Sequence, residues 1–173
     1  IQYREFITSL VSGDLGTSIR HNKSTVTLFG DRFINTLVLV GPVIPLVFLF
    51  GIAPGMIAGA RRGSIYDKGV RLMAVSSLAL PSFFLALILV YVFSIKLGLL
   101  PVSRMGGITH HILPSVTIIA FLSPGITRIL RSSMVEVMDT DYVRLARSKG
   151  LSEWVVIWKH SLKNAIIPVL SYG

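Results

Sequence analysis

The sequence has 173 residues, of which 52% are apolar and only 14% charged, and its mean hydropathy is +0.72. So few polar side chains cannot cover the surface of a soluble domain, and this composition excludes a soluble globular fold. The net charge of +9 does not indicate nucleic-acid binding, because the basic residues lie between long apolar runs and not on one soluble face.

In chain order, residues 1–32 form a mixed segment that we expect to be extracytoplasmic. Three runs without charged residues follow, at 33–60, 72–95 and 105–127. About 20 helical residues cross the roughly 30 Å hydrocarbon core of a bilayer, so each run predicts a membrane span. A further apolar stretch begins after Asn164. The sequence therefore predicts an all-α integral membrane fold with about three full spans and the start of a fourth. It opens without a Met and stops inside an apolar stretch, so we expect it to be incomplete at both ends.

The first apolar run has a glycine every fourth residue, at Gly51, Gly55 and Gly59. Positions four apart share a helix face, and small residues there let a second helix approach closely. We predict that this face is a helix-packing surface. The second run is broken by Pro81, which removes a backbone donor and disturbs a helix.

The distribution of Lys and Arg predicts the orientation. By span parity, segments 61–71 and 128–163 lie on one side of the membrane and hold 11 basic residues in 47 positions. Segments 1–32 and 96–110 lie on the other side and hold 6 in an equal length. Basic residues are enriched in cytoplasmic loops, so this bias places 128–163 in the cytoplasm.

Residues 138–168 predict two short helices, in a stretch that we expect to be cytoplasmic. Asp139 or Thr140 can cap the first, and Gly150 can take the left-handed conformation that ends it. Ser152 can cap the second helix, which we expect to present Trp154, Trp158 and Ser161 along one face. From pattern alone, that face could lie on the membrane surface, pack as an ordinary helix or dock on a partner protein, or the loop could be unstructured.

The sequence shows no recognisable motif for catalysis, metal binding or cofactor binding. The chain lacks cysteine, and the adjacent His110 and His111 point about 100° apart on a helix, so they cannot share one metal. We interpret Asp67 and Arg71 as an i, i+4 pair at a helix entry and nothing more. No span contains an acidic residue, which argues against a secondary transporter, and a channel or intramembrane enzyme would need charge rings or catalytic pairs. A membrane scaffold stays open.

Several motifs resemble one family of membrane proteins, the permeases of binding-protein-dependent ABC importers. Their cytoplasmic loop carries a Glu-Ala-Ala-x-x-x-Gly motif before a coupling helix, and here Arg144 stands at the Glu position. The peptide and nickel branch is the most similar, and the resemblance covers nearly the whole chain. The segments that carry it are Asp14–Ser18, Leu80–Phe83, Leu97–Pro101, Asp141–Gly150 and Asn164–Pro168.

The resemblance implies a permease subunit in the inner membrane, from a domain of about six spans, that forms a path for peptides or similar small solutes. The alternative within the same machinery is a nickel or other non-peptide permease. It implies as partners a second permease subunit, two ATPase subunits and an extracytoplasmic solute-binding protein. The chain has no phosphate-binding loop of its own, so ATP would be handled by a partner. The ATPase-coupling residues it implies are Arg144, Ala146, Gly150, Leu151, Glu153, Trp154, Trp158 and Lys159.

Overall fold

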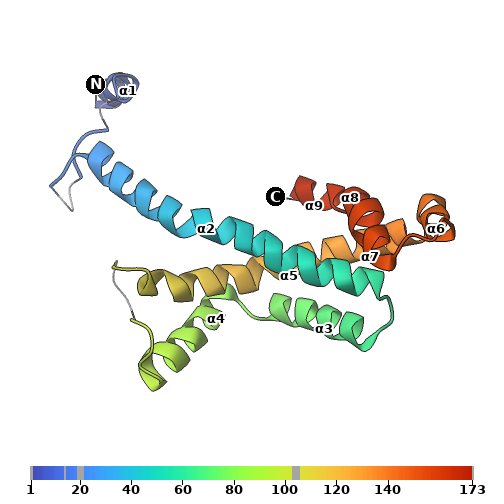
Figure 1. Ribbon diagram of the computed structural model, residues 1–173. Helices are drawn as coiled ribbons and strands as arrows, with labels where there is room; N and C mark the ends of the chain where they lie inside the picture. Colours follow the sequence, from blue (N-terminus) through green and yellow to red (C-terminus); the bar gives the residue numbers. More distant parts are fainter. Residues whose placement is uncertain (1, 14, 19–21, 103–105, 173) are drawn as a thin grey trace. The chain divides into compact units, whose positions relative to one another are not determined.

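The computed structural model describes residues 2–13, 15–18, 22–102 and 106–172, and this part of the chain is helical apart from one isolated bridge between Thr17 and Ser24 and the connecting turns (Figure 1). An all-α fold was predicted, and this is confirmed. The chain divides into two compact units, residues 1–42 and 43–173, which are described separately. The helices are α1 (Gln2–Val11), α2 (Thr25–Ala60), α3 (Ile65–Ala79), α4 (Ser82–Leu89), the π-helix η1 (Val90–Lys96), α5 (Thr109–Met138), α6 (Asp141–Ser148), α7 (Glu153–Val155), the π-helix η2 (Val156–Ser161), α8 (Leu162–Ala165) and α9 (Ile167–Tyr172).

The first unit holds α1, the Thr17–Ser24 bridge and the start of α2. We expected a helix to enter the membrane at Phe33, but α2 already begins at Thr25 and includes Asp31 and Arg32. The charged residues Asp31 and Arg32 interrupt the apolar run but not the helix. A helix depends on its backbone hydrogen bonds, and it can carry charged side chains where water is near. The segment 1–32 that we expect to be extracytoplasmic is therefore partly helical.

The second unit is built around α5. The later half of α2 packs on α5 and shares with it a buried apolar core that also takes in α8 and α9. Its members are Val43, Val47, Met56, Ile126, Leu130, Met134, Leu162, Ala165 and Val169. Helix α3 runs alongside α5 as well, on the N-terminal side of the break at Pro81 (Figure 1). The elements that follow α5 are thus held against the same helix that packs on α2.

The helix break predicted at Pro81 is present. Helix α3 ends at Ala79, Leu80 is extended, and α4 starts at Ser82, so that the two helices meet at a bend of 100°. Proline disfavours helical conformation in the residue before it and cannot donate a backbone hydrogen bond, which accounts for the extended Leu80.

Among the described residues, two helices, α2 and α5, are long and apolar enough to cross a membrane, and the bent pair formed by α3 with α4 and η1 makes a third candidate if it is one span. The predicted start of the third span, at residue 105, lies outside the described residues. Only 17% of the most apolar window of α2 and 22% of that of α5 is buried within the chain. Such a large exposed apolar surface is stable only against lipid or further helices, because in water it would drive association.

Candidate functional site

The segment after α5 folds into two helices joined by a tight turn. Helix α6 begins at Asp141 and ends at Ser148, and α7 begins at Glu153, where both helices were predicted, although the Ser152 side chain makes no capping hydrogen bond to α7. Gly150 has φ +76°, which confirms the left-handed conformation expected there. Its N–H donates to the carbonyl of Arg147 over 2.9 Å, closing the end of α6. Thr140 occupies the N-cap position, but its hydroxyl donates to the carbonyl of Val137 and does not cap the helix.

A small apolar core fixes this segment to the C-terminal end of α5. Val143, Ala146 and Val156 are buried together and pack against Val137 and Met138 of α5. Since α6 and η2 each contribute to this core, neither can move without the other or without the end of α5. The segment is therefore a packed extension of α5 and not an unstructured loop.

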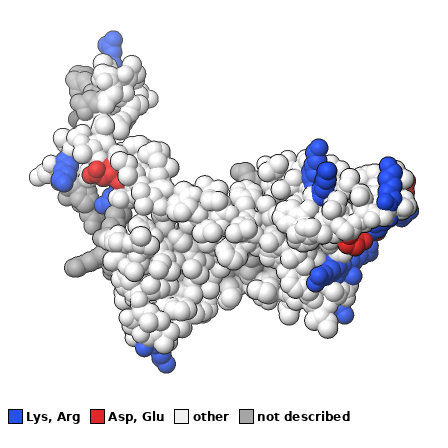
Figure 2. All heavy atoms as spheres, viewed as in Figure 1, with Lys and Arg blue, Asp and Glu red and all other residues white. Residues whose placement is uncertain are grey.

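An ion pair closes the same turn from the outside. The Arg147 guanidinium donates to both carboxylate oxygens of Glu153, at 2.7 and 3.5 Å, and so links α6 to α7. Both side chains are solvent-exposed, so this pair contributes little to stability and mainly fixes the angle of the turn. Arg144, Leu151 and Lys159 are all exposed nearby. Lys and Arg side chains gather over this end of the second unit (Figure 2).

The two tryptophans project from this rigid element. The side chains of Trp154 and Trp158 are 64% and 45% exposed, and their rings contact each other with centroids 5.4 Å apart. The prediction that Ser161 shares their face is wrong. Ser161 is fully buried, and its hydroxyl contacts the carbonyl of Val156 and the sulfur of Met138. The wider turn of η2 causes the change, because a π-helix rotates each residue less than an α-helix and turns Ser161 towards α5.

Gly150→Ala tests whether the left-handed turn holds this segment in place. No atom lies within 4 Å of an added Cβ at Gly150, so the penalty is conformational and amounts to about 1 kcal/mol. We expect a lower apparent melting temperature in detergent and faster proteolysis of residues 139–163. Gly69→Ala is the matched control. It too has open space, but it lies within α3, where alanine is favoured, so it should be neutral or stabilising. Equal effects of the two changes would contradict the assignment.

The predicted glycine face lies against α5. An added Cβ at Gly51 would lie 2.6 Å from the Ile126 side chain, and one at Gly55 would lie 2.7 Å from the carbonyl oxygen of Thr127. An added Cβ at Gly59 would collide with Met134. A hydrogen bond crosses the same contact, from the Thr127 hydroxyl to the carbonyl of Gly51, 3.0 Å long. The backbones of α2 and α5 therefore lie in close contact, which is possible because the glycines have no side chains.

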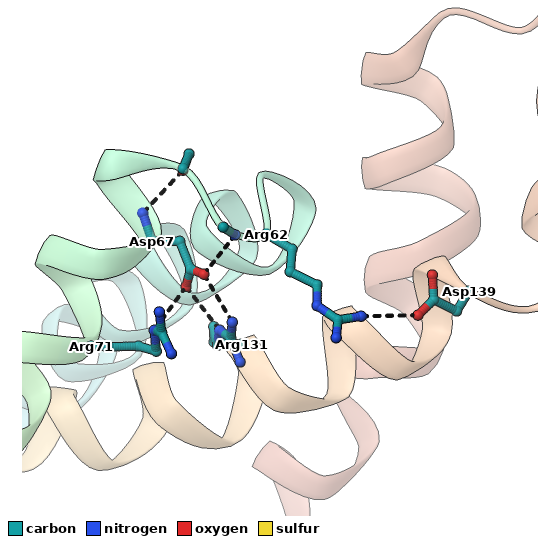
Figure 3. A network of polar contacts seen from close by, with 7 residues as sticks. Arg62, Asp67, Arg71, Arg131 and Asp139 are labelled. Atoms are coloured by element: carbon teal, nitrogen blue, oxygen red, sulfur yellow. Dashed lines mark hydrogen bonds and ion pairs between the residues drawn. The ribbon is translucent and has the colours of Figure 1, made fainter.

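A buried carboxylate lies close to this contact, in the first turn of α3 (Figure 3). Asp67 is 0% exposed and accepts from Nε and Nη2 of Arg131, both at 2.9 Å. It also accepts from the backbone N–H of Gly63 at 2.9 Å, and Arg71 lies 3.7 Å away. Its own N–H donates to the Ser64 hydroxyl, which caps α3.

The interpretation of Asp67 and Arg71 as a plain helix-entry pair is thus corrected. The main partner of Asp67 is Arg131, which lies 64 residues away on α5. Sequence spacing reveals only i, i+3 and i, i+4 neighbours, so it could not show this contact. A weak signal was available, because Arg131 follows soon after the apolar run of α5, where a charge needs a partner or water. A second cross-link lies nearby, between Arg62 and Asp139 at 3.3 Å, with both side chains exposed (Figure 3).

These features define a class of protein, a polytopic helical membrane protein with a rigid helical segment packed on the C-terminal end of one candidate span. A model of the family described as "Binding-protein-dependent transport system inner membrane component" matches residues 51–172. The chain belongs to this family and is an inner-membrane, multi-pass protein.

Individual relatives agree with this membership. The chain is 38% identical over 170 residues to "Glutathione transport system permease protein GsiC" of Escherichia coli O6:H1 (strain CFT073), and the alignment covers 98% of this chain and 56% of that protein. The protein of the same name in Escherichia coli (strain K12) gives the same values. That of Salmonella choleraesuis (strain SC-B67) is 37% identical over 171 residues, covering 99% and 56%. This chain therefore spans a little over half the length of these relatives.

Proposed function

We propose that this chain is part of the permease subunit of an ATP-driven importer, which forms the translocation path for peptides or similar small solutes. The family membership and the names of the relatives support an import permease. The proposed partners are a second permease subunit, two ATPase subunits and an extracytoplasmic solute-binding protein, all within or against the lipid bilayer. ATP hydrolysis belongs to the ATPase partners, so this subunit is not an enzyme and holds no cofactor.

Within that complex, residues 139–163 form the docking element for an ATPase subunit, and we call them the coupling segment. The observation that carries this proposal is the exposed Trp154–Trp158 pair on a helix held by a buried core and a closed turn. Paired aromatic side chains on a rigid support match what binding hot spots require, because little conformational entropy is lost when they are buried. A face meant only for lipid would need no such packing onto α5.

The solute is proposed as peptide-like, with glutathione as the first probe, because the relatives are named glutathione permeases. A nickel or other non-peptide solute is the alternative within the same machinery. The coupling segment faces the ATPase and not the solute, so its residues do not choose between these solutes. The alternative from a different class of membrane protein is a channel or scaffold that binds no ATPase.

Co-purification tests the docking proposal. The full-length permease is expressed with its candidate ATPase and second permease subunits, with Trp154→Ala/Trp158→Ala compared against wild type. We expect ATPase recovered with the permease to fall at least about tenfold, since removing two hot-spot aromatics costs at least about 2 kcal/mol. Uptake of labelled glutathione into proteoliposomes should fall with it.

The matched control is Phe29→Ala/Phe33→Ala. These two exposed aromatics also stack at i, i+4, with centroids 5.8 Å apart, but by the predicted orientation they do not face the cytoplasm. ATPase recovery should equal wild type. If the tryptophan variant retains its ATPase, the docking role is wrong. If no ATPase accompanies wild type, the importer proposal itself fails and a channel or scaffold replaces it.

A further inference from the structure

The Asp67–Arg131 pair occupies a branch point between three helices. The backbone carbonyl of Arg131 lies against Gly59 of α2, 3.0 Å from where a Cβ would be, while its side chain reaches Asp67 on α3. The Asp67 carboxylate also accepts a hydrogen bond from the backbone N–H of Gly63, which lies in the loop that joins α2 to α3. One arginine therefore contacts α2 through its backbone and α3 through its side chain while belonging to α5.

The Asp67–Arg131 pair fixes both the distance and the angle between α3 and α5. A guanidinium that donates two parallel hydrogen bonds to one carboxylate has a defined plane as well as a defined length. The third bond, from Gly63, prevents the carboxylate from rotating with the arginine. The contacts at Gly55 and Gly59 position only α2 on α5, so the orientation of α3 on α5 depends on the packing between these two helices and on the ion pair.

Burial makes a purely stabilising role a poor explanation. Asp67 is 0% exposed and the Arg131 side chain only 19%, and desolvating two charges usually cancels the attraction between them. An apolar pair of similar size would hold the helices together at least as well. What an apolar pair does not supply is one fixed relative orientation.

The coupling segment joins the same helix two turns further on. Arg131 is followed on α5 by Met134, which packs on Gly59, and then by Val137 and Met138, which hold the coupling segment. A force applied to the coupling segment thus enters α5 just beyond Arg131 and meets the Asp67 contact before it reaches the apolar part of the helix. The Asp139–Arg62 pair links the segment to the α2–α3 turn as well, but both side chains are exposed and such a link is weak.

We propose that Asp67 and Arg131 are positioning residues that lock the cytoplasmic ends of α2, α3 and α5 into one rigid body, so that movement of the coupling segment moves all three helices together. This inference rests on the proposed function. Without the pair, the ATPase would still dock and hydrolyse ATP, but its movement would carry α5 with the α2 packed on it and would be passed less completely to α3.

The test uses Asp67→Asn/Arg131→Met in the full-length permease complex. The introduced asparagine keeps an acceptor for the Gly63 N–H, and no unpaired buried charge remains, so the double variant should fold and assemble. The readout is the labelling rate of Thr117→Cys, a half-buried position beside a cavity between α4 and α5, in a background without other cysteines. Rates are compared without nucleotide and after trapping with ATP and vanadate.

In wild type, we expect trapping to change the labelling rate, and in the double variant we expect this change to shrink about tenfold, within the usual range of coupling between sites. ATPase recovery and ATP hydrolysis should stay near wild type. Arg128→Met is the matched control, because it removes an exposed arginine three residues before Arg131 on the same helix. Its trapping response should equal wild type.

Four outcomes overturn the proposal. A double variant that assembles and responds like wild type shows that the pair transmits nothing. Loss of assembly in the double variant shows a structural role, and so does an ATPase activity that falls in step with the labelling response. Absence of any ATPase or trapping response in wild type marks failure of the proposed function itself and takes this inference with it.

Discussion

Gly55→Leu should disrupt the packing of α2 on α5 and abolish most of the folded protein. The first added carbon already lies 2.7 Å from the carbonyl oxygen of Thr127, and backbone cannot rotate away as a side chain can. The helices must separate, which also stretches the hydrogen bond from Thr127 to Gly51. We expect a loss of about 3 kcal/mol or more, at the upper end of the range for overpacked sites. Size-exclusion profiles and thermal denaturation in detergent measure it.

Gly41→Leu is the control for this change. Gly41 lies on the same helix, and no atom is within 4 Å of a Cβ there, so leucine adds only apolar surface and helix propensity. The profile and the melting temperature should match wild type. If Gly55→Leu is as well tolerated as Gly41→Leu, the close approach of α2 and α5 is wrong.

The second large effect is expected from breaking the Asp67–Arg131 pair on one side only. Asp67→Asn leaves the Arg131 charge without its counter-ion, and Arg131→Met leaves a fully buried carboxylate with Arg71 as its remaining partner at 3.7 Å. Each single change should cost about 3 kcal/mol of stability, whereas the double variant should recover most of that loss. Thermal denaturation of the four proteins in one detergent gives the coupling energy.

Arg62→Gln provides the comparison for an exposed pair. The partner of Arg62 is Asp139, both side chains are about two-thirds exposed, and such pairs contribute about 1 kcal/mol or less. Its melting temperature should stay close to wild type. Simple addition of the two single losses in the Asp67/Arg131 double variant would show that the two side chains do not interact.

Local signals predicted the coupling segment well. Gly150 ends α6 and Glu153 starts α7, as expected, because caps and left-handed glycines act within one turn of the chain. The membrane class also followed from composition alone, since the balance of apolar and charged residues decides whether a chain can dissolve in water. The glycine spacing in α2 indicated a contact face, although it did not say which helix would meet it.

Helix limits were harder to predict, because the apolar runs and the helices have different physical causes. Helix α2 begins eight residues before the apolar run does, and α5 continues to Met138, well past Thr127. Hydropathy reports which residues can face lipid, and a helix continues wherever its backbone hydrogen bonds are not interrupted. The π-turn in η2, which moves Ser161 away from the tryptophans, has no signal in residue spacing.

The sequence by itself determined the helical membrane class, the break at Pro81, the turn at Gly150 and the glycine face of α2, because each depends on composition or on neighbours within one or two turns. Only the tertiary structure decided that the glycine face of α2 packs on α5 and that Asp67 forms its ion pair with Arg131. Residues 64 positions apart meet through the packing of whole helices. That packing depends on how all the side chains fit together, which no local pattern contains.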